Sequence, residues 1–153
     1  MTKKYSVLFV CIHNSARSQM AEAFLREMGG ECFSVESAGL EAGSLNPLVV
    51  EVMRERGIDI SQQKTALVDD LIRQGRQFDY VITVCDASSG QKCPIFSGTT
   101  ERLHWSFDDP AALSGCDEEK KEKIRRIREQ IRQKISFFLQ EQKKSCIKYN
   151  MSR

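Results

Sequence analysis

The sequence predicts a single-domain, three-layer α/β/α protein with a four-stranded parallel sheet. Two observations predict this fold: short runs of β-forming apolar residues alternate with amphipathic segments, and no repeat, low-complexity tract or linker interrupts the 153 residues. Strands that alternate with helices pair in parallel, with helices on both faces. We expect one domain over residues 1–153, in which the basic end, 143–153, is a flexible tail.

Four segments have the composition of strands. Residues 5–10 form a short apolar run that is typical of a strand buried on both faces, and residues 79–84 form a second clear one. Shorter strands are expected over 33–37 and 102–105. These segments supply the expected sheet.

Four segments are predicted to be helical. Apolar residues recur at helical spacing over 18–28, before two glycines, and again over about 117–142. A helix over 46–56 is expected to begin at Asn46 as N-cap with Pro47 in the first turn, and another helix covers 66–75.

Composition excludes several classes of partner and location. The net charge is only +2, which gives no overall attraction to nucleic acid or to a membrane surface. No stretch reaches the roughly 20 apolar residues that span a bilayer, and the first apolar run is too short for a secretory signal. We expect a cytoplasmic monomer that binds neither nucleic acid nor membrane.

The chain has six cysteines. In a reducing compartment structural disulfides are not expected, and the paired short spacings of a zinc site are absent. Thiol chemistry therefore competes with ordinary buried cysteines as their explanation. Cys32, Cys116 and Cys146 have no partner at a meaningful spacing and are expected to have no role.

The segment from Cys11 to Ser18 predicts an oxyanion site. Cys11 follows a strand, and Ser18 opens a helix, so the backbone N–H groups between them converge near the positive end of that helix. The guanidinium of Arg17 is a planar fork that suits two oxygens of a tetrahedral anion. The same setting favours the thiolate of Cys11 as a nucleophile. The expected binding residues are Ile12, His13, Asn14, Ser15, Ala16, Arg17 and Ser18.

These residues carry a family resemblance. The blocks CIHNSARSQMAEA, ESAG, GIDIS, DYVITVC and HWSFDDPA occur in one order along nearly the whole chain. In that order they resemble the low-molecular-weight tyrosine phosphatase fold group, and within it the thioredoxin-coupled arsenate reductases. The resemblance, not the periodicity, implies arsenate as substrate, with phosphate or sulfate as mimics, and a role in arsenic detoxification.

The resemblance also implies the remaining catalytic residues. Asp109, directly before a proline, matches the general acid. Cys11 would attack arsenic, Cys85 would resolve the adduct, and Cys93 would take over the oxidised bond. The resulting Cys85–Cys93 disulfide would be reduced by thioredoxin, the external reductant. The segment between these cysteines is polar and glycine-bearing, and it is one residue longer than is usual for the family.

No tightly bound cofactor or metal is expected. Some members of the resembled family bind potassium through residues that match Asn14, Glu22 and Ser37. Two further positions differ, since Lys64 stands where threonine is usual and Ala66 where aspartate is usual. A lysine ammonium can supply the positive charge of the ion, so we predict that potassium is not bound.

Three other functions stay open at this point. Cys11, Arg17 and Asp109 suffice for a low-molecular-weight protein tyrosine phosphatase, although Ala111 and Ala112 stand where such phosphatases have aromatic residues. An oxyanion-sensing module would need neither the acid nor the recycling cysteines. A reductase coupled to glutaredoxin or mycothiol would generally do without both later cysteines.

Overall fold

The computed structural model describes residues 4–84, 101–110 and 114–151, of which 143–151 are described by their backbone alone. Cys85 and Cys93 therefore lie outside the described residues. Within the described part, no helix is long and apolar enough to cross a membrane.

The sheet is the expected one. Its strands are β1 (Tyr5–Cys11), β2 (Phe33–Gly39), β3 (Tyr80–Thr83) and β4 (Glu101–His104). They lie in the order β2-β1-β3-β4, and all three pairings are parallel. This confirms the predicted four-stranded parallel sheet, with strand ends shifted by one or two residues.

Strand β1 is the centre of the core because its two faces pack against different helices. Val7, Phe9 and Cys11 belong to the larger buried cluster, whereas Leu8 and Val10 belong to a smaller one. Successive side chains of a strand point to opposite faces, so the unbroken apolar run satisfies both layers at once. Cys11 thus lies on the face of the larger cluster.

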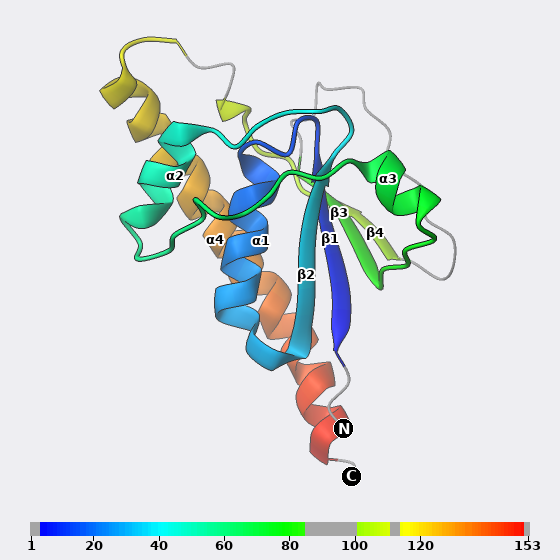
Figure 1. Ribbon diagram of the computed structural model, residues 1–153. Coiled ribbons are helices and arrows are strands. Elements are labelled where there is room, and N and C mark those ends of the chain that lie inside the picture. Colours follow the sequence, from blue (N-terminus) through cyan, green and yellow to red (C-terminus); the bar gives the residue numbers. More distant parts are fainter. Residues whose placement is uncertain (1–3, 85–100, 111–113, 152–153) are drawn as a thin grey trace.

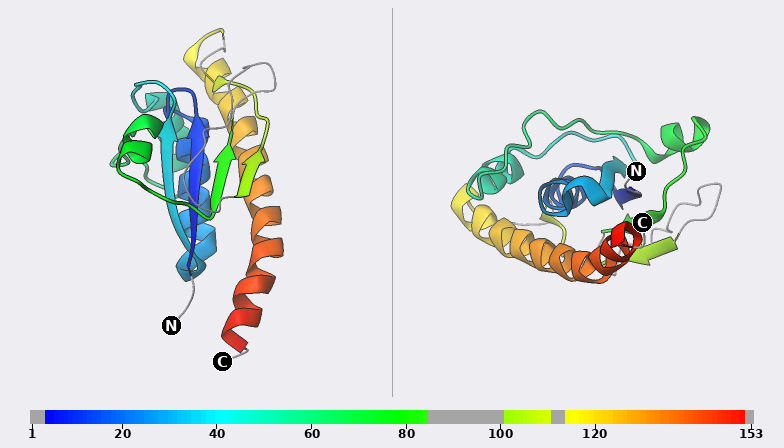
Figure 2. Two further views of the ribbon diagram at one scale, coloured as in Figure 1. Left: turned by 90° about the vertical axis from the view of Figure 1, so that its right-hand side faces the viewer. Right: turned by 90° about the horizontal axis from the view of Figure 1, so that it is seen from below.

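Helices cover both faces, as Figures 1 and 2 show. Helices α1 (Arg17–Gly29), α2 (Pro47–Arg54) and α4 (Asp117–Met151) lie on one side, and the short α3 (Val68–Arg73) lies on the other. A 3₁₀ turn, η1 (Gly30–Cys32), connects α1 to β2. The start of α2 is as expected, because the Asn46 side chain accepts a hydrogen bond from the Leu48 N–H and Pro47 stands in the first turn.

Helix α4 is longer than the expected 117–142 and continues to Met151. Its apolar stripe includes Ile127, Ile131 and Ile135, which are buried against the core. Phe138 contacts the rings of Tyr80 and Trp105 at centroid distances of 5.4 and 5.7 Å. These contacts hold the helix along the sheet, where Figure 2 shows it running past the strands.

One cysteine differs from expectation. Cys32 is in a disulfide, whereas Cys11 and Cys116 are free thiols. The prediction of no structural disulfide was therefore wrong for Cys32. It rested on the redox state of the compartment, which does not determine which cysteines a fold brings together. Cys32 directly precedes the first residue of β2, whereas Cys11 is the last residue of the parallel strand β1. The two cysteines therefore lie at opposite ends of the strands.

Candidate active site

The oxyanion loop, residues 11–18, joins the last residue of β1 to the start of α1. Three of its carbonyl oxygens accept hydrogen bonds from a neighbouring segment. Three bonds run from Leu40 N to Cys11 O, from Glu41 N to Ile12 O and from Asn46 N to Ser15 O, at 3.0, 2.8 and 2.9 Å. These carbonyl oxygens, the negative ends of their peptide dipoles, bond to the neighbouring segment. The remaining backbone N–H groups of the loop and the N-terminus of α1 favour an anion at the centre of the loop.

The Cys11 sulfur has two hydrogen-bond partners. Its Sγ atom lies 2.9 Å from Ser18 Oγ, and it accepts the backbone N–H of Asn14 at 3.2 Å. Ser18 Oγ also accepts a hydrogen bond from Asn14 Nδ2 at 2.7 Å. Cys11 is buried in the loop, with only 3% of its surface exposed.

Asn14 has the backbone conformation that shapes the loop. Its φ of 54° is the only positive value among the described non-glycine residues. Asparagine tolerates this left-handed region better than most residues. Its side-chain Oδ1 also accepts the Ala66 N–H at 3.0 Å, so Asn14 ties the loop to a segment 52 residues further along the chain.

Arg17 connects the loop to the segment that carries the expected general acid. It is buried, donates through Nη1 to the Phe107 carbonyl at 3.1 Å, and has Nη2 3.6 Å from Asp109 Oδ1. The Asp109 side chain is 33% exposed, so it lies at the mouth of the loop, where a proton can be exchanged with solvent. Residues 17 and 109 are thus brought together as predicted, although they are far apart in sequence.

Two glycines let the next segment pack against the oxyanion loop. A Cβ added at Gly39 would lie 2.9 Å from the Asn14 nitrogen, and one added at Gly43 would lie 2.5 Å from the His13 carbonyl oxygen. Real Cβ atoms do not approach backbone that closely, so these positions require glycine for space. His13 Nε2 lies 3.1 Å from Glu41 Oε2 on the exposed side, so this side chain joins the loop to the same neighbouring segment.

Strand β3 brings the chain before Cys85 next to the chain before Cys11. Thr83 pairs with Val10 across the sheet, and the Val84 N–H donates to the Val10 carbonyl at 2.8 Å. Val10 and Val84 directly precede Cys11 and Cys85 in sequence. The two strands thus carry the chain to the same edge of the sheet, and the position of Cys85 itself lies outside the described residues.

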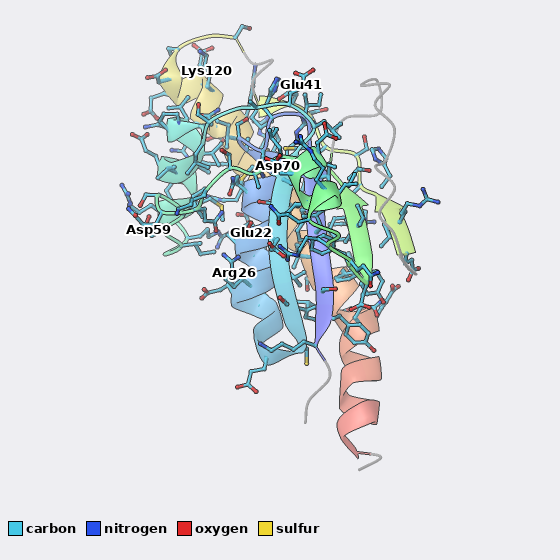
Figure 3. All side chains as sticks on the ribbon, turned by 45° about the vertical axis from the view of Figure 1, so that its right-hand side comes forward. Glu22, Arg26, Glu41, Asp59, Asp70 and Lys120 are labelled. Atoms are coloured by element: carbon cyan, nitrogen blue, oxygen red, sulfur yellow. The ribbon has the colours of Figure 1, made fainter. Side chains whose placement is uncertain are left out.

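Two of the residues that match a potassium site, Glu22 and Ser37, are paired with each other, and Glu22 also pairs with Arg26. Glu22 Oε1 accepts the Ser37 hydroxyl at 2.6 Å, and its Oε2 lies 2.7 Å from Arg26 Nη2. Figure 3 shows Glu22 and Arg26 one turn apart beside β2. The guanidinium already supplies the positive charge, so this arrangement does not fit a bound cation. In the part of the chain that the structure describes, no cluster of three or more acidic, histidine or cysteine side chains could hold a metal.

It is Arg26, not Lys64, that neutralises Glu22. Lys64 is exposed, and its carbonyl oxygen accepts a hydrogen bond from Gln19 Nε2 at 3.2 Å. Sequence reasoning missed this, although the four-residue spacing from Glu22 to Arg26 on a helix is a signal for such a pair. It also missed the contact of Gln19 with the oxyanion loop and the hydrogen bond from Gln63 to Gln19. No local sequence pattern indicates either contact.

The fold and the loop together suggest one family, and comparison with known proteins decides it. The family model described as low molecular weight phosphotyrosine protein phosphatase matches residues 6–148. The chain belongs to this family. Its oxyanion loop, Arg17 and Asp109 are therefore elements of a low molecular weight phosphatase fold, as the sequence blocks implied.

Within this phosphatase family, several proteins similar to this chain are arsenate reductases. The arsenate reductase of Bacillus licheniformis is 43% identical over 139 residues, covering 90% of this chain and 96% of the relative. A solved arsenate reductase in the phosphate binding state has a TM-score of 0.76 at 30% identity, covering 90% of this chain and 98% of that one.

A third similar protein is the thioredoxin-dependent arsenate reductase of Corynebacterium glutamicum. It is 34% identical, with a TM-score of 0.58, and the match covers 88% of this chain and 63% of that one. The resemblance to arsenate reductases drawn from the motifs is thus confirmed.

Proposed function

We propose that this member of the phosphatase family is an arsenate reductase that uses Cys11, Cys85 and Cys93 in turn and is recycled by thioredoxin. The observation that carries the proposal is the environment of the Cys11 sulfur. A buried sulfur that accepts the Asn14 N–H and lies 2.9 Å from Ser18 Oγ shares its loop with the buried Arg17, and Asp109 lies at the mouth of that loop. That combination supplies a nucleophile, an oxyanion clamp and a proton donor in one place.

The first step is a substitution at arsenic. The Cys11 thiolate attacks As(V), and one arsenate oxygen leaves as water after taking protons, one of them from Asp109. Arg17 holds two of the remaining oxygens through its planar fork. The product is a covalent thiol adduct in which arsenic is still As(V).

The redox step transfers two electrons to arsenic. The Cys85 thiolate attacks the Cys11 sulfur, and the electron pair of the sulfur–arsenic bond stays with arsenic, which leaves as As(III) arsenite. Cys93 then attacks Cys85 and releases the Cys11 thiolate, leaving a Cys85–Cys93 disulfide. The dithiol of thioredoxin reduces that disulfide and becomes oxidised. The attack of Cys85 on Cys11 needs the ends of β1 and β3 to lie close together. The hydrogen bond from the Val84 N–H to the Val10 carbonyl supports this closeness.

A phosphatase is the second candidate function, because the family and the geometry both favour it. Cys11, Arg17 and Asp109 suffice to form and protonate a phosphoryl-thiol intermediate, without any further cysteine. We therefore expect weak phosphatase activity beside the reductase activity. The two later cysteines distinguish the two functions.

The deciding experiment follows NADPH oxidation with arsenate, thioredoxin and thioredoxin reductase. Serine variants at 11, 85 and 93 should each lose steady turnover, whereas Cys116→Ser, which removes an exposed free thiol, should keep it. Unchanged reductase turnover in Cys85→Ser would contradict the relay. Unchanged phosphatase turnover in the same variant is expected, because phosphoryl transfer needs only the Cys11 site.

We also propose that no potassium ion takes part, because Arg26 already neutralises Glu22. The cytoplasmic location, the monomeric state and the absence of nucleic-acid or membrane partners stay predictions from the sequence.

A further inference from the structure

Gln19 is a wholly buried polar residue that the proposed chemistry does not use. It lies in α1 with 0% of its surface exposed, two residues after Arg17. A buried amide is costly unless its donor and acceptor are both satisfied, so its partners indicate its purpose.

The Gln19 amide holds the oxyanion loop from behind. Its Nε2 donates to the Asn14 carbonyl at 2.9 Å and to the Lys64 carbonyl at 3.2 Å. Asn14 is the residue in the left-handed conformation. Rotation about its Cα–C bond sets the direction of its carbonyl, so a hydrogen bond to that carbonyl restrains the Asn14 backbone. Gln19 therefore holds the backbone at the loop residue that has a positive φ.

Gln19 is itself held by a second amide. Gln63 donates through Nε2 to Gln19 Oε1 at 2.7 Å and to the Gln19 carbonyl at 3.3 Å. Arg26 Nη1 in turn donates to Gln63 Oε1 at 3.4 Å while its other nitrogen pairs with Glu22. A chain of hydrogen bonds thus runs from a half-exposed guanidinium through two amides to Asn14. Chains of this kind orient each member through its neighbour.

We infer that Gln19 is a positioning residue for the Cys11 thiolate, acting through Asn14 and supported by Gln63. Asn14 makes two bonds that matter to the sulfur: its N–H donates to Cys11, and its Nδ2 orients Ser18. If the Asn14 carbonyl loses its partner, the Asn14 backbone is free to leave the left-handed conformation, and its N–H and Nδ2 groups no longer keep their positions beside Cys11 and Ser18. The sulfur then loses donors, and the thiol is favoured over the thiolate. This inference rests on the proposed role of Cys11 as nucleophile.

The test measures the reactivity of Cys11 without arsenate or thioredoxin. Iodoacetamide alkylation of the Cys11 peptide is followed by mass spectrometry over a range of pH in wild type, Gln19→Met and Gln63→Ala. Methionine is close to glutamine in size but has no amide. We expect the midpoint of the alkylation profile to rise by roughly 0.5–1 pH unit in Gln19→Met, the size of one lost hydrogen bond, and by less in Gln63→Ala. We also expect kcat/KM for arsenate to fall roughly 5- to 10-fold in Gln19→Met.

The matched control is Gln62→Ala, because Gln62 is an exposed neighbour of Gln63 with the same side chain. It should leave the profile unchanged. If Gln19→Met fails to fold, as judged by circular dichroism, the half-buried Gln63 position still gives a reading. Profiles that coincide in wild type and both amide variants would overturn the inference. An absence of arsenate reduction in wild type beside a shifted profile would instead refute the proposed function and leave the positioning role standing.

Discussion

At the scale of single residues, the site depends on which charge lies next to which. The Glu22 side chain is only 9% exposed, and the half-exposed Arg26 side chain provides the counter-charge for its carboxylate. A buried carboxylate without a cation nearby is strongly destabilising, so this pair is needed for the fold behind the loop. From the sequence we expected Lys64 to supply the positive charge. The four-residue spacing on one helix instead places Arg26 beside Glu22.

The ion pair predicts how the protein responds to potassium. Replacing sodium by potassium in the buffer should leave the thermal unfolding midpoint and the KM of the wild type unchanged, because the guanidinium already occupies the charge position. In Arg26→Leu the midpoint should fall, and potassium should restore part of it by neutralising Glu22. Differential scanning fluorimetry in matched salts measures both effects.

Arg73→Leu is the control for this prediction, since Arg73 forms an exposed pair with Asp70 at 3.5 Å that contributes little. A wild type that potassium stabilises as strongly as it stabilises Arg26→Leu would show that the ion binds after all.

At the scale of elements, the oxyanion loop keeps its shape because another segment packs against its outer side. The segment 39–46 donates three backbone hydrogen bonds to loop carbonyls and approaches the loop closely at Gly39 and Gly43. The strand–loop–helix order was predictable because it is encoded within a few consecutive residues. The packing of the second segment was not, since it joins parts of the chain separated by about thirty residues and has no periodic signal.

Gly43→Ala should therefore disturb the loop without introducing backbone strain. The added methyl would meet the His13 carbonyl oxygen, a backbone atom that cannot move cheaply. We expect a loss of roughly 1–3 kcal/mol in the free energy of unfolding, the usual cost of overpacking. Urea denaturation checks this value, and kcat/KM for arsenate should fall at the same time. Ser44→Ala, at the next exposed position, should change neither quantity; equal stability of both variants would contradict the predicted contact.

At the scale of the whole molecule, a cluster of charges joins α4 to the end of α2. Glu55 contacts Arg125 at 2.9 Å and Arg128 at 2.9 Å, and Glu129 pairs with Arg56 and Arg128. Hydrogen bonds from Arg125, and then from Arg128, lower the pKa of Glu55 to about 2. Burial raises the pKa of Glu129, but hydrogen bonds from its three arginine partners outweigh it and bring that pKa to about 2 as well. Because these carboxylates are partly exposed, salt should weaken the cluster.

The pH dependence of stability follows from these shifts. A carboxylate whose pKa is lower in the folded chain than its ordinary 4.5 stabilises the fold above that pH and loses the contribution as the pH falls from about 4.5 toward 2. Glu55→Gln should therefore be less stable than wild type near neutral pH, and the difference should shrink across this acidic range. Thermal unfolding followed by circular dichroism at a series of pH values measures it. Glu31→Gln, which changes an exposed carboxylate in η1, should run parallel to wild type; a constant gap between Glu55→Gln and wild type would contradict the linkage.

The sequence by itself determined the order of strands and helices, the parallel sheet and the oxyanion loop. Each of these depends on contacts between near neighbours or on the periodic placement of apolar residues, and both can be read along the chain. The tertiary structure alone decided that Gln63 holds Gln19 and that Cys32 enters a disulfide. Such contacts between distant side chains depend on how packed layers cross in space, and neither composition nor local spacing specifies that crossing.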